Sequence, residues 1–443
     1  MQPEHLHYAE RQAPRYTSYP TAPHFNTGVD ADTVARWLAE LPATSRLSLY
    51  LHVPYCQSLC WYCGCNTYAA RRDEPVLDYV DTVLKEIELA ASKLTARQVV
   101  EIHWGGGTPN ILSEQQFETI TQRLARRFDI AANAQHAIEL DPRFITRDKA
   151  DAYVRAGVNR ASLGVQDLNA RVQQAIGRVQ PLEIVEAAVA TLRAAGLNQI
   201  SMDLMYGLPH QTTDDLSNTI RLAAAMAPNR IALFGYAHVP WFKKRQRLIP
   251  EAALPGASER FDQAEAARIE LQRLGYVAIG LDHFALPEDE FALARDQGRL
   301  RRSFQGYVVQ DADALVGFGP SAISTLPQGY AQNAPEPGAW GQMIAQGQLA
   351  IVRGHKLDDA DRIRRRLIEQ IMCDFSADLA PLGGAEACAS ELETLAPMFA
   401  DGMVQLEGDR ILLSEKARPF CRLTAMAFDA YAASGAARHS RAV

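Results

Sequence analysis

Ser48-Leu-Tyr-Leu-His-Val-Pro-Tyr-Cys-Gln-Ser-Leu-Cys-Trp-Tyr-Cys-Gly-Cys-Asn66 is the stretch that decides the fold. Four of the seven cysteines of the chain lie in it, at Cys56, Cys60, Cys63 and Cys65. Apolar residues alternate with other residues from Leu47 to Val53, which is the period of a strand. We therefore expect a thiol-bearing loop at the end of a strand, where it can hold a metal ion or a cluster.

The composition is that of a globular protein with one large and one smaller unit. The chain has 443 residues, 47% of them hydrophobic, and a formal net charge of -7, so it lacks a basic signature for nucleic acid. No apolar run reaches spanning length and the first residues are polar, so we expect neither a membrane span nor a secretory signal. An odd number of cysteines, most of them on one loop, argues against a disulfide framework and favours a reducing cytoplasm.

Strand and helix patterns alternate after the lead-in. Strand patterns end at Cys56 and recur at Val99–Trp104, Ala137–Leu140, Arg160–Val165, Gln199–Met205 and Arg230–Phe234. Helical patterns cover Val76–Leu94, a segment starting at the capping box of Ser113, Asp148–Ala156, Leu182–Ala195, Thr213–Ala227 and Ala257–Leu274. This alternation predicts an α/β fold with a parallel sheet, closed either as a doubly wound open sheet or as a full or partial barrel.

Polar and glycine-rich residues gather where these strands end. They are Cys56, Gly105–Thr108, Glu139, Gln166, Asp203 and His238. In both closures the carboxyl ends of the strands surround one binding site, so we expect these residues around one pocket. Each of Glu139, Gln166, Asp203 and Arg178 has an equally good structural interpretation, but together they suit a ligand with hydroxyls, an ammonium and a carboxylate. His238 and His283 are better explained as structural histidines.

The two ends of the chain have other patterns. Residues 1–45 form an irregular lead-in whose Arg15–Pro20 segment is either a packed arm or, less favoured, a substrate contact. Gly280–Phe284 is expected to end one more strand and Gly317–Ser321 to form a turn. A helix at Asp359–Phe375, a hairpin at Met403–Leu413 and a closing helix at Lys416–Tyr431 predict a small, mostly helical, winged-helix-like domain. We therefore divide the chain into an arm (1–45), a barrel with an extension (46–356) and a C-terminal domain (357–443).

Three cysteines in a Cys-x3-Cys-x2-Cys arrangement are consistent with two metal centres. Structural zinc needs four ligands, which His52 or Cys65 would have to complete. A [4Fe-4S] cluster on three thiolates leaves one iron open to a small molecule, which points to catalysis instead of electron transfer. Cys65 can also be considered as a fourth ligand of such a cluster.

The motif Cys56-x3-Cys60-x2-Cys63 with Tyr62, together with Gly105-Gly106-Gly107-Thr108-Pro109, resembles the signature of the radical S-adenosylmethionine (SAM) enzymes. Within that superfamily the chain resembles the oxygen-independent coproporphyrinogen III oxidases from about Pro14 to its end. The matching motifs are Pro14–Pro20, Cys63–Asn66, Leu163–Asp167, Asp203–Pro209, Tyr236–His238 and Phe304–Tyr307. Departures from the family pattern occur at Gly235, Val308, Val309 and Pro320.

The resemblance implies a partial (β/α)6 TIM-like barrel with a [4Fe-4S] cluster on Cys56, Cys60 and Cys63, while Cys65 stays outside the ligand set. It also implies two SAM molecules in one active site. The positions matching the first SAM are Tyr50, Gly106, Glu139 and Ile323, of which Tyr50 and Glu139 are also expected to be catalytic. The positions matching the second are Tyr62, Gly107, Thr108, Gln166, Arg178, Asp203 and Ala237.

The implied reaction is the oxidative decarboxylation of two propionates of coproporphyrinogen III to vinyl groups, which gives protoporphyrinogen IX for heme. A 5'-deoxyadenosyl radical derived from SAM removes a hydrogen, carbon dioxide leaves, and one electron passes to an unknown acceptor. The expected partners are this substrate, held by candidates Arg15, Arg301 and Arg302, and an electron donor of flavodoxin or ferredoxin type. We expect a cytoplasmic monomer. The alternative is a heme-binding or heme-trafficking relative, but such relatives typically lack the Arg15–Pro20 arm and the Gly64-Cys65-Asn66 segment.

Overall fold

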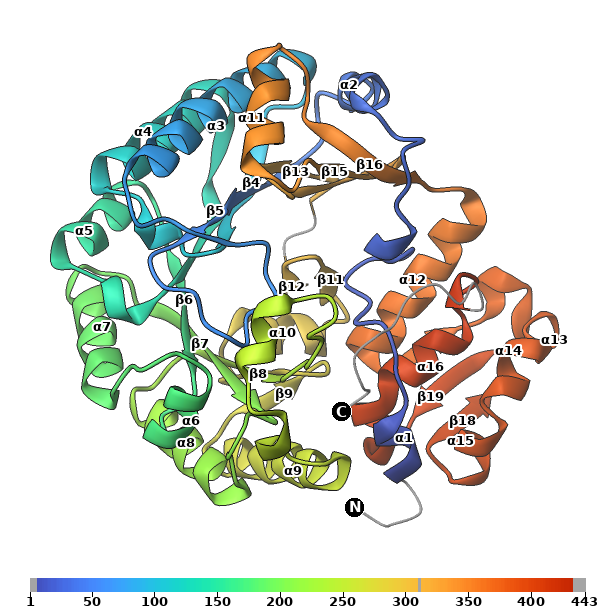
Figure 1. Cartoon of the computed structure of the whole chain (residues 1–443). Coiled ribbons are helices and arrows are strands. Elements are labelled where there is room, and N and C mark those ends of the chain that lie inside the picture. Colours follow the sequence, from blue (N-terminus) through green and yellow to red (C-terminus); the bar gives the residue numbers. More distant parts are fainter. Residues whose placement is uncertain (1–5, 310–311, 433–443) are drawn as a thin grey trace.

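A computed structural model describes residues 6–309 and 312–432 of the chain. Its centre is a sheet of 12 strands in which six parallel strands follow one another in chain order. Figure 1 shows these six as an arc that opens toward the C-terminal region. They are β1 (Leu47–Val53), β4 (Gln98–Gly106), β5 (Asp129–Leu140), β6 (Arg160–Gln166), β7 (Gln199–Tyr206) and β8 (Arg230–Gly235). Sequential order without a switch in direction excludes the doubly wound alternative and confirms the partial barrel.

Helices cover the outer face of this arc (Figure 1). They are α3 (Glu74–Lys93), α4 (Glu114–Arg127), α5 (Arg147–Arg155), α6 (Ala170–Ala175), α7 (Leu182–Ala194), α8 (Thr213–Ala225) and α9 (Ala257–Arg273). The predicted capping box begins α4, because Ser113 accepts from the Gln116 backbone N–H while the Gln116 side chain accepts from that of Ser113. Leu47, Leu49 and Leu51 are fully buried toward these helices, and Ser48, Tyr50 and His52 alternate with them.

Antiparallel strands extend the sheet at both edges. Next to β1 lies β13 (Ala314–Phe318), which is parallel to it, and the antiparallel β14 (Ile323–Leu326), β15 (Gly329–Asn333) and β16 (Ile351–Lys356) follow, with α11 (Pro337–Ala345) between the last two. Next to β8 lie β10 (His283–Ala285) and β9 (Val277–Ile279), and α10 (Glu290–Asp296), β11 (Arg301–Ser303) and β12 (Gly306–Val308) follow in the chain. Two short strands, β2 (Tyr55–Cys56) and β3 (Tyr68–Ala69), pair with each other across the cysteine loop.

Four expectations about local structure were wrong. The lead-in contains α1 (Leu6–Glu10) and α2 (Ala31–Ala39), the latter because Asp30 caps a segment whose Val34, Trp37 and Leu38 pack on the barrel. Gly280 has φ 53 and turns the chain between β9 and β10, so that segment is a hairpin and not a single strand end. Gly317 and Phe318 still belong to β13. Pro419 lies in a 3-10 turn, Glu415–Phe420, so the closing helix shortens to α16 (Cys421–Ala427).

The C-terminal region is helical with one small sheet. It comprises α12 (Asp359–Asp374), α13 (Gly384–Ala387), α14 (Ala389–Thr394), α15 (Ala396–Ala400) and α16, with β17 (Ser376–Asp378), β18 (Val404–Glu407) and β19 (Arg410–Leu413). The hairpin of β18 and β19 is the one predicted at Met403–Leu413. Its core also contains Tyr8, Tyr16 and Tyr19, so the first part of the arm packs here while α2 packs on the barrel. The three-part division stays a prediction, and residues 1–5 and 433–443 of it lie outside the described ranges.

Candidate active site

The glycine-rich turn at the end of β4 holds the cysteine loop by its backbone. Gly107 N–H donates to Val53 O at 2.7 Å and Thr108 N–H to Tyr55 O at 2.9 Å. A Cβ on Gly107 would lie 2.6 Å from Tyr55 O and 2.9 Å from Val53 O, closer than real side chains approach. Glycine is therefore required here because two backbone segments touch, and the contact sets the position of Cys56.

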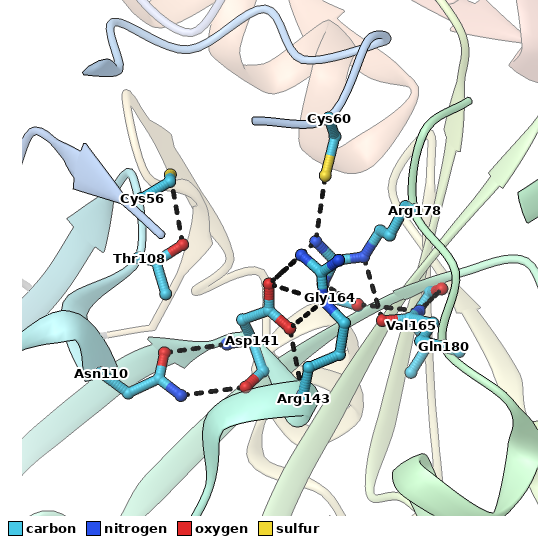
Figure 2. A network of polar contacts seen from close by, with 10 residues as sticks. All are labelled: Cys56, Cys60, Thr108, Asn110, Asp141, Arg143, Gly164, Val165, Arg178 and Gln180. Carbon is cyan, nitrogen blue, oxygen red and sulfur yellow. Dashed lines mark hydrogen bonds and ion pairs between the residues drawn. The ribbon is translucent and has the colours of Figure 1, made fainter. Parts of the chain in front are cut away.

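Two of the three motif cysteines receive a hydrogen bond at sulfur from a predicted SAM-binding residue (Figure 2). Thr108 Oγ1 donates to Cys56 Sγ at 3.2 Å, and Arg178 Nη1 donates to Cys60 Sγ at 3.3 Å. Burial raises the pKa of the Cys56 thiol to about 11. Hydrogen bonds from Cys65, one of them from its backbone N–H at 3.4 Å, lower the pKa of Cys63 to about 6. Hydrogen bonds to sulfur stabilise thiolates and tune the potential of iron–sulfur clusters.

A polar network that the sequence did not reveal fixes Arg178 (Figure 2). Its Nη1 also lies 3.2 Å from Asp141 Oδ2, and its Nε donates to Gln180 Oε1 at 3.0 Å. Arg143 binds the same carboxylate at 2.7 Å, so Asp141 stays ionised with a lowered pKa although burial opposes this. The remaining members are Asn110, whose Nδ2 donates to Asp141 O at 2.9 Å, and the carbonyls of Gly164 and Val165. The position of Asp141 just after β5 was the one available signal, because strand ends point at the pocket.

A second group of polar side chains lines the inner face of the arc. Glu139 Oε1 lies 3.0 Å from His103 Nε2, and Tyr50 OH lies 3.0 Å from His52 Nδ1. Burial alone would raise the pKa of Glu139, but the bonds to His103 and to the Gly106 backbone lower it, so this side chain is an anion. Asp203 differs, because burial and the neighbouring Glu139 charge raise its pKa to about 7. His103 was not predicted, and His52 was considered only as a zinc ligand; both alternate inward on their strands.

The other predicted site residues lie at the same rim. Gln166 ends β6 with φ 68, and a Cβ on Gly164 would lie 3.0 Å from its Nε2. Gln246 connects two of the predicted SAM positions, Tyr62 and Ala237. Its Nε2 donates to Tyr62 O at 2.8 Å and to Ala237 O at 3.1 Å. Ile323 begins β14 beside Gly317, which pairs with Tyr50. The eleven predicted SAM positions thus lie on strands of the sheet, in the loops that follow them or in the cysteine loop, although SAM contact itself stays a prediction.

The donor set suits a cluster on three thiolates better than zinc. His52, the proposed fourth zinc ligand, has both ring nitrogens engaged, with Tyr50 OH and, at 3.0 Å, with Asn66 O. Three soft thiols on one loop, each hydrogen-bonded at sulfur, fit an iron–sulfur cluster.

The substrate candidates line two cavities. Arg15 and Arg302 line a cavity of about 540 Å³ at the end of β8, which Ala237 also lines. Arg301, again together with Arg302, lines another cavity of about 580 Å³, whose wall includes Ser48 of β1 and Glu101 of β4. His238 and His283 each have a polar partner, Tyr236 OH at 2.9 Å and Asp282 at 2.7 Å, in agreement with a structural role.

Known proteins are similar to this chain over nearly its whole length. Residues 50–223 match the family model of the radical SAM superfamily. Oxygen-independent coproporphyrinogen III oxidase of Bradyrhizobium diazoefficiens is 48% identical over 442 residues, which covers 98% of this chain and 98% of that protein. The chain belongs to the oxygen-independent coproporphyrinogen III oxidase family. The Escherichia coli member is 38% identical over 424 residues, 94% of this chain and 93% of that protein.

The solved structure of the Escherichia coli family member, described as a radical SAM enzyme, has the same fold. It superposes with a TM-score of 0.90 at 37% identity, over 95% of this chain and 100% of that chain. Membership in the family confirms the predicted radical SAM barrel, and it implies a [4Fe-4S] cluster and SAM as cofactors. None of the helices within residues 6–309 and 312–432 combines the length and the apolar character needed to span a bilayer.

Proposed function

We propose that this protein is an oxidoreductase that converts coproporphyrinogen III to protoporphyrinogen IX without oxygen, in the biosynthesis of heme. The observation that carries the proposal is the three-cysteine loop held at the rim of an open (β/α)6 barrel, in a chain that matches named oxidases almost end to end. The Arg15–Pro20 arm and Gly64-Cys65-Asn66 are both present, which favours the oxidase over a heme-trafficking relative.

Cys56, Cys60 and Cys63 would hold the [4Fe-4S] cluster, with Cys65 outside the ligand set. Reduced cluster and SAM, when bound, supply the radical that removes a hydrogen atom from a propionate β-carbon. The chain's own residues orient the reactants and exclude water. Thr108 and Arg178 donate to the cysteine sulfurs, and Gly107 keeps the loop in contact with β4.

Two SAM molecules would share the rim. The first meets Tyr50, Gly106, Glu139 and Ile323, and the second meets Tyr62, Gly107, Thr108, Gln166, Arg178, Asp203 and Ala237. Glu139 is anionic and 43% of its side chain is exposed to the inside of the arc, which suits it to an ammonium or to ribose hydroxyls. Together with Tyr50, which reaches the same inner face, it is our candidate for a catalytic role. With a pKa of about 7, Asp203 can accept or donate a hydrogen bond near neutral pH.

The electron donor would be a small acidic carrier of flavodoxin or ferredoxin type. Beside the cysteine loop, the segment 241–248 exposes Trp241, Phe242 and Leu248 and contains four cations without an acidic residue. Lys243 Nζ in this segment donates to Cys65 O at 3.1 Å, which joins it to the loop. Opposite charges steer such encounters, whose interfaces are small. We also propose a cytoplasmic monomer, in keeping with the reduced thiols that the cluster needs.

An anaerobic assay with reconstituted cluster, SAM, a reductant and coproporphyrinogen III tests the proposal. Protoporphyrinogen IX and two 5'-deoxyadenosine per product are expected. Cys60→Ala should lose iron and SAM cleavage, whereas Cys65→Ser should keep its iron, because only the first is a ligand. Tight stoichiometric heme binding by a wild-type protein that shows no turnover would reverse the assignment to an oxidase.

A further inference from the structure

The cavity at the end of β8 lies where three parts of the chain meet. It is bounded by β8, by α9 and by the segment Glu415–Arg422 of the C-terminal region. Figure 1 shows α1, α9 and α16 in this part of the molecule, and Tyr8 of α1, Ala257 of α9 and Leu423 of α16 belong to one core. Its volume of about 540 Å³ falls in the range of small-molecule sites. Aromatic rings form much of the wall, and two of them, Phe261 and Phe420, are stacked with centroids 5.9 Å apart.

Positive charge dominates this cavity, unlike the acidic chain as a whole. Seven cationic side chains and three carboxylates line it. Two of the arginines are neutralised locally, Arg268 by Glu265 and Arg418 by Glu415 at 2.7 Å. Arg302 is different, because its Nε and Nη1 are buried and have no hydrogen-bond partner among the described residues. Buried guanidinium donors left without an acceptor are costly, so this position calls for an anionic ligand.

The edge of the cavity nearest the strand ends is held by two further arginines. Arg15 Nη2 donates to Gly235 O at 3.1 Å and Arg260 Nη1 to Tyr236 O at 2.9 Å, so both guanidinium groups sit at the end of β8. A Cβ on Gly235 would lie 2.8 Å from Tyr206 Oη and 3.3 Å from Arg260 Nη2. Gly235, which departs from the family pattern, therefore makes room for Tyr206 and Arg260 at the entrance from the barrel.

We propose that this cavity binds the substrate's macrocycle through carboxylates that do not react, so that a reacting propionate reaches the strand-end rim. The ligand class is a polycarboxylate with a large apolar body. Aromatic walls suit the body and guanidinium groups suit the carboxylates. Because Ala237 and Tyr206 line the cavity and also lie at the strand ends, a molecule bound here extends toward the cluster loop. The inference rests on the proposed function, since it takes coproporphyrinogen III as the substrate.

Direct binding of coproporphyrin III, the stable oxidised form with the same four carboxylates, tests this assignment. Its fluorescence is titrated with cluster-reconstituted protein carrying Arg15→Gln, Arg260→Gln or Arg268→Gln. Arg299→Gln is the matched control, because Arg299 belongs to the same charged run as Arg302 but is exposed and lines neither cavity. Iron content, SAM binding and melting temperature are measured for each variant, and placing the variants both in the N-terminal arm (Arg15) and in α9 (Arg260 and Arg268) guards against one that does not fold.

We expect Arg15→Gln and Arg260→Gln to raise the dissociation constant about tenfold or more, and Arg268→Gln, whose charge Glu265 already neutralises, to raise it less. KM for coproporphyrinogen III should rise with the dissociation constant while SAM binding stays normal. Folded, iron-loaded variants that bind as tightly as Arg299→Gln would overturn the inference even if wild type turns over. Wild type that binds coproporphyrin III through these arginines without converting the porphyrinogen would instead overturn the proposed function.

Discussion

Gly107→Ala should detach the cysteine loop from the end of β4. The new Cβ would lie 2.6 Å from Tyr55 O and 2.9 Å from Val53 O, and both atoms are backbone, so no side chain can rotate away. To remove this clash, the backbone at Gly107 and the backbone at Val53–Tyr55 must move apart. That movement breaks the hydrogen bonds from Gly107 N to Val53 O and from Thr108 N to Tyr55 O. Two such bonds contribute roughly 1–3 kcal/mol. The separation also moves Thr108 away from Cys56.

The expected result is a protein that folds with a melting temperature lowered by a few degrees but binds much less iron after reconstitution. Iron content and the visible absorption of the cluster measure the effect, with SAM cleavage as a second readout. Gly64→Ala is the matched control: it lies on the same loop, nothing lies within 4 Å of its Cβ position, and it should load iron like wild type. Wild-type iron content in Gly107→Ala would refute the argument that backbone contact at Gly107 positions the loop.

Three further predictions concern the surroundings of the site. Arg178→Lys removes the branched guanidinium group whose separate N–H donors bind Cys60, Asp141 and Gln180. Activity or iron affinity should therefore fall about tenfold or more in reconstitution assays. Burial raises the pKa of Glu86 to about 7, so its folded form binds the proton more tightly than the unfolded chain does. The free energy of unfolding should therefore fall by up to about 3 kcal/mol as pH rises from 4.5 to 7. Chemical denaturation of Glu86→Gln at several pH values should give a free energy of unfolding that lacks this fall. Lys244→Gln with Arg247→Gln should slow turnover driven by an acidic flavodoxin, more so at low salt, while dithionite-driven turnover stays unchanged.

The strand-end residues were predictable because one rule covers them. A parallel strand has a period of two and ends at the binding face, so Glu139, Gln166 and Asp203 could be assigned to one rim from their positions along the chain. The sequence assigned the Gly105–Thr108 motif to ligand binding. The structure shows a second need for glycine, because the Gly107 backbone contacts Val53 and Tyr55, which are distant in the chain. Arg178 meets the Asp141 carboxylate, which Arg143 also binds, and these two segments lie 37 residues apart in the chain, a distance that no spacing rule connects.

The N-terminal arm had two competing interpretations, and its residues divide between them. Tyr16 OH donates to Asp429 at 3.0 Å and Tyr330 OH donates to Tyr19 O at 3.1 Å, so the tyrosines fasten the arm to the C-terminal region and to β15. Arg15, one residue earlier, points the other way and reaches Gly235 O at the end of β8. The packing of Tyr16 and Tyr19 therefore positions Arg15 at the rim.

This division gives the C-terminal region a part in the site. Arg422 Nη1 donates to Ala13 O at 3.1 Å, and Arg422 also lines the cavity where Arg15 and Arg302 lie. A change that loosens the core around Tyr16 and Phe420 would therefore displace Arg15 and open the cavity while β4 still holds Cys56. Since the cysteine loop depends on the barrel and the cationic cavity depends on both ends of the chain, SAM cleavage and substrate binding should be separable by mutation.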